Sequence, residues 1–136
     1  MPEGLITIDS QFDALTSLER LEQAIAANGM TLFARIDHAE GARRAELFLP
    51  PTVILLFGNS KVGSPLMQKN RAIGLDLPLK LLVWEDDTGI THVTYNDADW
   101  LAARHSISES AMPNIRKLKT VFQKVLNSIT TDNHGL

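Results

Sequence analysis

The chain has 136 residues, 44% of them apolar and 21% charged, which is the composition of a single folded domain rather than a disordered chain. Its net charge of −3 argues against non-specific binding to nucleic acid or acidic membranes. The absence of cysteine excludes disulfides, thiolate metal sites and a cysteine nucleophile.

The first part of the chain predicts two strands and two helices. Weak alternation over Leu5–Asp9 predicts a strand. Ser10 is expected to cap a helix that runs from Phe12 to Asn28-Gly29, where glycine can adopt a left-handed conformation. A second strand is expected at Met30–Asp37 and a short alanine-rich helix at Ala39–Glu46.

The middle of the chain contains the most apolar strand. Pro50-Pro51 marks a break, and Thr52–Phe57 is a continuous apolar run. We expect a loop over Gly58–Gly63. Ser64-Pro65 then predicts the start of a short helix that stops by Gly74, since serine is a frequent cap and proline a frequent first residue.

A hairpin and two helices are predicted for the rest. Leu79–Glu85 and Ile90–Asn96 are expected to pair, and Asp97 to cap a short helix through Arg104. A last helix is predicted over Pro113–Ile129. This order indicates an α+β (two-layer α/β) fold, with a mixed sheet of about five strands packed with about five helices.

The domain organisation is expected to be simple. We expect one domain over residues 1–136, with a core at about 4–107, the last helix at about 113–129 and a frayed tail at 130–136. No apolar run approaches 18 residues, and Met1-Pro2-Glu3-Gly4 does not resemble a signal peptide, so we expect a cytoplasmic protein without membrane partners.

Two central strands predict self-association. The strands at Val53–Phe57 and Leu79–Trp84 are apolar on both faces, and the helices of so short a chain are expected to cover only one. The last helix has an apolar seam with spacings of three and four, formed by Ile115, Leu118, Phe122, Val125 and Ile129. Further apolar residues, Val121 and Leu126, lie off that seam. We therefore expect a homodimer that packs this helix or a sheet face across a two-fold axis.

Several motifs in the middle of the chain resemble the family called domain of unknown function 302. They are Ile36-Asp37-His38, Gly74-Leu75-Asp76-Leu77-Pro78-Leu79-Lys80, Val83-Trp84-Glu85-Asp86 and Tyr95-Asn96-Asp97. The resemblance covers roughly residues 4–107 and departs from the family pattern at Ser60 and Ser64. It implies a compact domain grouped, by shape alone, near the TATA-binding-protein-like folds. The family name carries no activity.

The segment Gly58–Pro65 is one candidate site. A glycine-rich turn before a helix can hold an anion, and Asn59 and Gly63 would contact it. The spacing of Gly58 and Gly63 matches the start of a P-loop, but Ser64-Pro65 follow where lysine and serine or threonine are required, so nucleotide hydrolysis is rejected. The alternative is a tight strand-to-helix turn.

A second candidate set is polar. Asp37-His38 could serve as a general base, and His105 ends a short helix. Lys80 shares a strand face with Leu82 and Trp84, so we expect a partly buried ammonium paired with Asp37, Asp76 or Glu85. The alternative roles are helix capping and a structural ion pair.

Metal and cofactor chemistry has little support. His38 and His105 are only weak metal candidates because the chain has no close histidine spacing, and we expect no metal and no cofactor. His134 lies in the predicted tail. The basic residues of the last helix are expected to form a solvated face rather than a nucleic-acid site.

The sequence therefore predicts an oligomeric domain that binds a small polar or anionic ligand. The ligand-binding candidates are Asp37, His38, Asn59, Gly63, Asp76, Lys80 and His105. The alternatives are an enzyme that uses Asp37, His38 and Lys80 for acid–base chemistry, and a purely structural interaction domain. Of these readings, catalysis has the least support.

Overall fold

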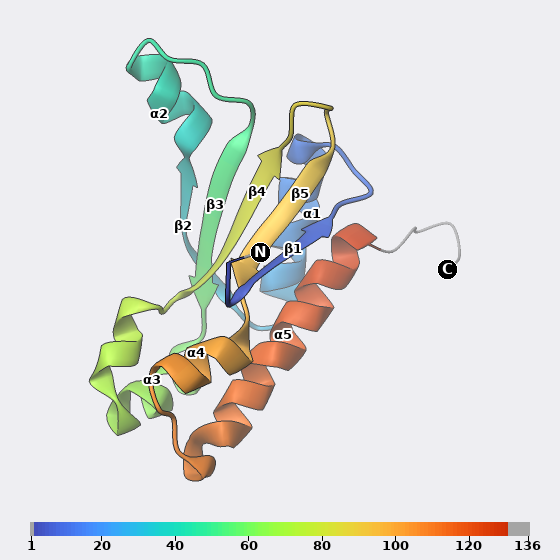
Figure 1. The fold of residues 1–136 in the computed structure, drawn as a ribbon. Helices are drawn as coiled ribbons and strands as arrows, with labels where there is room; N and C mark the ends of the chain where they lie inside the picture. Colours follow the sequence, from blue (N-terminus) through green and yellow to red (C-terminus); the bar gives the residue numbers. More distant parts are fainter. Residues whose placement is uncertain (1, 131–136) are drawn as a thin grey trace, which may run out of the picture.

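Five strands form one sheet in the order β1-β5-β4-β3-β2 in a computed structural model that describes residues 2–130 (Figure 1). The strands are β1 (Leu5–Asp9), β2 (Thr31–Asp37), β3 (Thr52–Gly58), β4 (Leu79–Glu85) and β5 (Thr91–Asn96). The α+β class and the five strands are confirmed. All four pairings are antiparallel, so the sheet is not the mixed sheet expected from the order of elements.

Five α-helices and two short 3₁₀-helices lie between or after the strands in the described chain. They are α1 (Ala14–Ala27), α2 (His38–Arg44), α3 (Ser60–Lys69), η1 (Arg71–Leu75), α4 (Ala98–Arg104), η2 (Glu109–Ala111) and α5 (Met112–Thr130). Asp97 caps α4 as expected, since its carboxylate accepts from the Asp99 amide. Part of the predicted frayed tail, residues 131–136 with His134, lies outside the described residues.

One face of the sheet packs against helices and forms the core. Val53, Leu55 and Phe57 of β3 point to this face and are buried, as are the alternate residues of β4. Helix α1 lies behind the sheet in Figure 1 and packs along α5. The alternation of buried and partly exposed positions follows from the two-residue repeat of a strand.

The apolar seam of α5 belongs to this core. All five seam residues and Leu126 are buried, and Val121 packs against the core. The Phe122 ring contacts Phe57 edge-on at 6.2 Å and Tyr95 at 4.7 Å between centroids. The apolar seam of α5 is therefore used within one copy, and a sheet face is the other surface that the sequence predicts for an interface.

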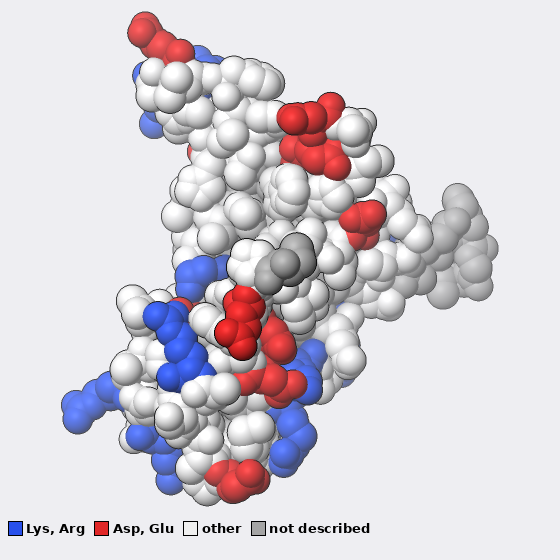
Figure 2. Space-filling view, in the orientation of Figure 1, with Lys and Arg blue, Asp and Glu red and all other residues white. Residues whose placement is uncertain are grey.

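The opposite face, which we call the open face, carries Ala34, Ile36, Ile54, Leu56, Leu82 and Trp84. Ile36, Ile54 and Leu82 lie side by side in the register of β2, β3 and β4. Figure 1 shows no described helix over β3 and β4 on this side, and Figure 2 shows a broad surface there without charged groups. The prediction that the helices cover only one face of these strands is confirmed.

Three local expectations were wrong. Helix α3 begins at Ser60 and not at Ser64, because Asn59 accepts a hydrogen bond from the Lys61 amide and caps it, and Pro65 lies inside the helix. Asp13 and not Ser10 caps α1, through the Thr16 amide. The helical repeat predicts one buried stripe on α1 formed by Leu15, Leu18, Leu21 and Ile25. The last three are buried, but Leu15 is exposed.

Candidate functional site

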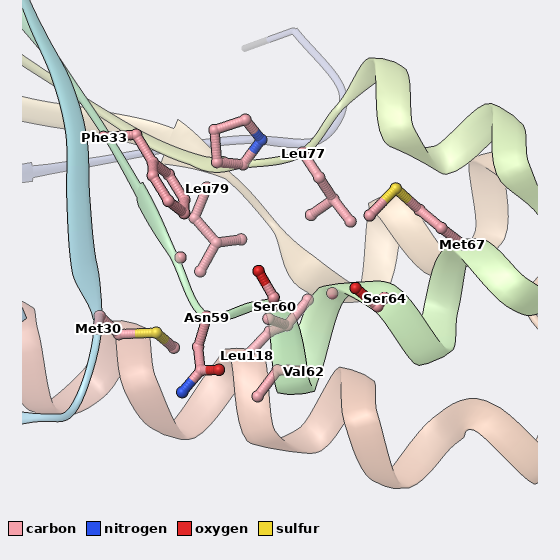
Figure 3. A pocket seen from close by; sticks show the side chains of 13 residues that line it. Met30, Phe33, Asn59, Ser60, Val62, Ser64, Met67, Leu77, Leu79 and Leu118 are labelled. Carbon is pink, nitrogen blue, oxygen red and sulfur yellow. The ribbon is translucent and has the colours of Figure 1, made fainter.

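A small pocket lies at the end of the sheet where β2 begins and β3 ends (Figure 3). Its volume is about 200 Å³. Its walls come from the start of β2, the β3–α3 connection, the first turns of α3, the segment before β4, and α5. The lining residues are Met30, Phe33, Gly58, Asn59, Ser60, Val62, Gly63, Ser64, Met67, Leu77, Pro78, Leu79 and Leu118.

The lining is apolar with a polar rim. Eight of the 13 side chains are apolar, and none of the described residues that line the pocket carries a charge. The exposed hydroxyls of Ser60 and Ser64 supply polar groups, and Figure 3 shows the Ser60 hydroxyl directed toward Leu77 and Leu79. The pocket therefore suits a small apolar molecule with one polar end.

Three amides at the start of α3 are already used inside the chain. The Lys61 amide donates to Asn59 Oδ1 at 2.8 Å, and the amides of Val62 and Gly63 donate to the Asn59 carbonyl at 2.9 and 3.0 Å. Asn59 Nδ2 donates to the Gly29 carbonyl. The structure thus brings Asn59 and Gly63 to one pocket, but their amide groups do not offer the free donors that an anion needs.

Asp76, Lys80 and His105 form a second cluster, which also includes Arg104. The Asp76 carboxylate lies 2.5 Å from His105 Nε2 and accepts from Arg104 Nη1 at 3.0 Å. Lys80 Nζ donates to the carbonyls of Asp76 and Pro78, so its hydrogen bonds are not with a carboxylate as expected. Burial lowers the pKa of Lys80, and the charge of Asp76 opposes that effect. This cluster is a hydrogen-bonded network around one largely buried carboxylate.

Asp37 and His38 lie elsewhere. Asp37 caps α2 through the Glu40 amide, and His38 is exposed at the start of that helix. In the sheet register, Lys80 of β4 lies opposite Leu56 of β3, which lies opposite Ala34 of β2. Asp37 is therefore two strands away from Lys80 and three residues further along β2. The structure does not bring Asp37 and His38 to Lys80 for acid–base chemistry, nor His38 to His105. Within residues 2–130, no three His, Cys, Asp or Glu side chains are grouped to hold a metal ion.

Sequence reasoning missed a third cluster, formed by Asp9, His92 and Asp86. His92 Nδ1 lies 2.7 Å from Asp9 Oδ1, and Nε2 lies 2.6 Å from Asp86 Oδ2. Because ionised carboxylates only accept hydrogen bonds, two such partners favour the form of His92 in which both ring nitrogens carry protons, the imidazolium. The pKa of His92 is raised, chiefly by its hydrogen bond to Asp86 and to a smaller extent by Asp9. Partial burial of the ring has the opposite effect. The cluster joins β1, β5 and the β4–β5 turn.

We predict that replacing His92 with glutamine removes part of the pH dependence of stability. A raised histidine pKa stabilises the fold fully below the ordinary value of about 6.5, and the contribution is lost as pH rises through the folded value. From about pH 6 to 9, the melting temperature of the original chain should therefore fall further than that of His92→Gln. His38→Gln, at an exposed position, is the control. Parallel pH profiles for His92→Gln and the original chain would contradict the prediction.

Comparisons with known proteins place the chain among relatives of the same fold. The model for the family described as "Domain of unknown function DUF302" matches residues 6–125. A crystal structure of an uncharacterized conserved DUF302 protein from Bacillus stearothermophilus is similar with a TM-score of 0.82. The similarity covers 93% of this chain and 98% of that one, at 20% identity. This likeness shows the fold.

Curated proteins similar to this chain are named as ion channels. Two proteins named "Fluoride-specific ion channel FluC 1", from Brucella suis and Brucella abortus, are 44% identical to this chain over 117 residues. The match covers 86% of this chain but only 46% and 43% of those proteins, so the chain spans less than half of their length. Among the described helices, none is both long and apolar enough to cross a bilayer.

Proposed function

The chain belongs to the DUF302 family, and from that premise we propose that it is a binding domain whose pocket takes a small, largely apolar molecule with one polar end. The pocket at the start of α3 is the observation that carries this proposal. A cavity of about 150 Å³ can hold benzene, so one of about 200 Å³ suits a ligand only slightly larger. The ring of apolar side chains would bury its body, and the serine hydroxyls would hydrogen-bond its polar end.

A neutral polar end is favoured over an anion. A hydroxyl group both donates and accepts, as do Ser60 and Ser64, whereas the amides nearest the pocket are bonded within α3. This proposal differs from the small polar or anionic ligand that the sequence predicts, because the proposed molecule is largely apolar and only its end is polar. The proposed site keeps Asn59 and Gly63 from the sequence candidates and leaves out Asp37, His38, Asp76, Lys80 and His105.

Binding of hexan-1-ol tests the pocket. We predict that hexan-1-ol raises the melting temperature by mass action, and that Gly63→Leu abolishes the increase by filling the cavity. A Cβ at Gly63 would lie 3.7 Å from Leu77 Cδ1, an ordinary contact, so the variant should fold. Hexanoate and inorganic phosphate are compared in parallel and should have smaller effects.

The matched control is Ala26→Leu, which adds the same side chain at an exposed position of α1 and should keep the full increase. A melting temperature indifferent to hexan-1-ol in the original chain would refute the ligand proposal. An increase that survives in Gly63→Leu would show that the alcohol binds elsewhere.

We also propose that the domain is a homodimer formed through the open face. Its support is the uncovered apolar surface over β3 and β4, since monomeric proteins rarely leave a large contiguous apolar patch in water. Light scattering at micromolar concentration should give twice the 15.0 kDa of one chain. A mass of one chain without concentration dependence would refute the dimer.

A second candidate function comes from the names of the curated relatives. We propose that this domain accompanies a fluoride channel, as the part of such a protein that lies outside the bilayer; its support is that it matches less than half of those proteins and that its described helices are unsuited to a bilayer. Deleting the matching 117 residues from the Brucella suis protein should lower fluoride efflux from vesicles or the amount of assembled channel. Unchanged efflux and unchanged amount would contradict this role.

A further inference from the structure

The segment that joins β2 to β3 projects beyond the sheet, and we call residues 38–51 the arm (Figure 1). Helix α2 has no buried residue. After it, Leu47 and Phe48 are 68% and 88% exposed, and Leu49 is also exposed. Three consecutive large apolar side chains that are exposed on the arm are unfavourable in water. A surface of a second molecule could bury them.

The arm and the pocket lie at opposite ends of the same two strands. Strand β3 runs from Thr52, next to the arm, to Gly58, at the pocket. The six steps from Thr52 to Gly58, at about 3.4 Å each, separate the two ends by roughly 20 Å. The arm of one copy therefore cannot reach the pocket of the same copy.

A two-fold dimer through the open face would bring the arm of one copy to the pocket of the other. If the axis lies parallel to the sheet and runs across the strands, the open faces stack about 10 Å apart with strand direction reversed. Position across the sheet is unchanged by this rotation. The arm end of β2 and β3 in one copy then lies over the pocket end of β2 and β3 in the other.

The charges on the sheet favour this axis. Asp86 and Asp87 lie just after the end of β4, with Asp9 and the His92 imidazole beside Asp86, so this end remains acidic. Lys80 lies near the start of β4, on the open face. An axis along the strands would place the acidic ends of both copies together. An axis across the strands places each acidic end over the partner's Lys80, which is the complementary arrangement.

The area of the open face alone is smaller than a stable dimer interface requires. Five strands about 4.8 Å apart, with 32 residues in all, give a face of roughly 520 Å² per copy, or about 1,000 Å² for two. Stable interfaces bury about 1,200 Å² or more. The exposed arm tips supply the additional apolar surface.

The pocket has an aromatic edge on the open-face side. A Cβ at Gly58 would lie 3.4 Å from the Phe33 ring and 3.7 Å from Pro78, so these two residues lie where the open face meets the pocket. Phe33 is 54% exposed. We propose that Phe48 of each copy packs beside the partner's Phe33 and closes the partner's pocket, so that each binding site is completed by a second copy of the chain. This inference rests on the proposed dimer and the proposed pocket.

Disulfide trapping tests the arrangement directly, because the chain has no cysteine of its own. Both Phe48 and Ser64, at the pocket rim, are exposed, so a chain with Phe48→Cys and Ser64→Cys should fold. Disulfides need Cα atoms within about 7 Å, which excludes a link within one copy. On mild oxidation we expect a covalent dimer of twice 15.0 kDa, and none from either single variant.

The control pairs Phe48→Cys with Gln23→Cys on the exposed side of α1, and it should give no covalent dimer. If light scattering shows a dimer but residues 48 and 64 do not link, the arm inference fails and the dimer stands. A monomer by light scattering overturns both. Hexan-1-ol should also raise the melting temperature of Phe48→Ser by at most half as much as that of the original chain. Equal increases in the two chains would show that the pocket is complete without the arm.

Discussion

Replacing Phe122 with alanine should lower the free energy of unfolding by about 3 to 5 kcal/mol, the range for removing a buried aromatic side chain. The Phe122 ring is 4% exposed and contacts both Phe57 and Tyr95, so its loss leaves a cavity between α5 and the sheet. Domains of this size are stable by about 5 to 15 kcal/mol, so the variant should lie near the limit of folding. Urea denaturation followed by circular dichroism measures the change.

The control for this core substitution is Leu15→Ala, at an exposed position of α1, which should change stability little. Phe122→Asp is the more severe test and should give an unfolded chain, because a carboxylate there would be buried without a partner. A folded monomer from Phe122→Asp would place this residue at an interface between copies and contradict the core assignment.

Replacing Asp76 with alanine should cost about 2 to 4 kcal/mol, because it breaks a largely buried ionic network. The carboxylate is 13% exposed and accepts from Arg104, while the buried His105 lies against it. Without it, Lys80, Arg104 and His105 lie together with no carboxylate at their centre. Urea denaturation at neutral pH measures the loss.

Asp99→Ala provides the matched control for Asp76→Ala. Asp99 pairs with Lys119 on the surface, with both side chains about half exposed, and such pairs contribute little. Asp76→Asn, which keeps the shape and can still accept a hydrogen bond, should fall between the two. Equal stability of the Asp76→Ala and Asp99→Ala variants would show that the network contributes no more than a surface pair.

The strands were predictable because their signals are local. Alternation and apolar runs predicted the bounds of all five strands to within one residue at each end. The apolar side chains on both faces of β3 and β4 were also visible in the sequence. The start of α3 was not, because Gly63 and Pro65 disfavour a helix interior and outweighed the cap at Asn59. The available signal in the sequence was Asn59 itself, since asparagine is a preferred first cap of a helix, and in the structure its side chain accepts from the Lys61 amide.

The site was less predictable because it depends on partners distant in the sequence. The loop after β3 drew attention through its glycines, yet the pocket there is made by Phe33, Leu77 and Leu118, which no local pattern connects. The cluster at His92 needs the register that sets Asp9 opposite it, 83 residues away. Strand order and register come from tertiary packing, so spacing within one segment could not give these contacts.

The position of β1 determines the order in which the chain can fold during synthesis. Strands β2 to β5 pair as successive neighbours, so they can form a sheet as each leaves the ribosome. Strand β1 is made first but pairs only with β5, through contacts such as Thr7 with Thr94, 87 residues apart. Gln11 then bonds to the Ile129 and Thr130 carbonyls near the end of α5. Strand β1 is thus made before the other four strands but is the last of the five that can pair, and the contacts of Gln11 wait until α5 has emerged.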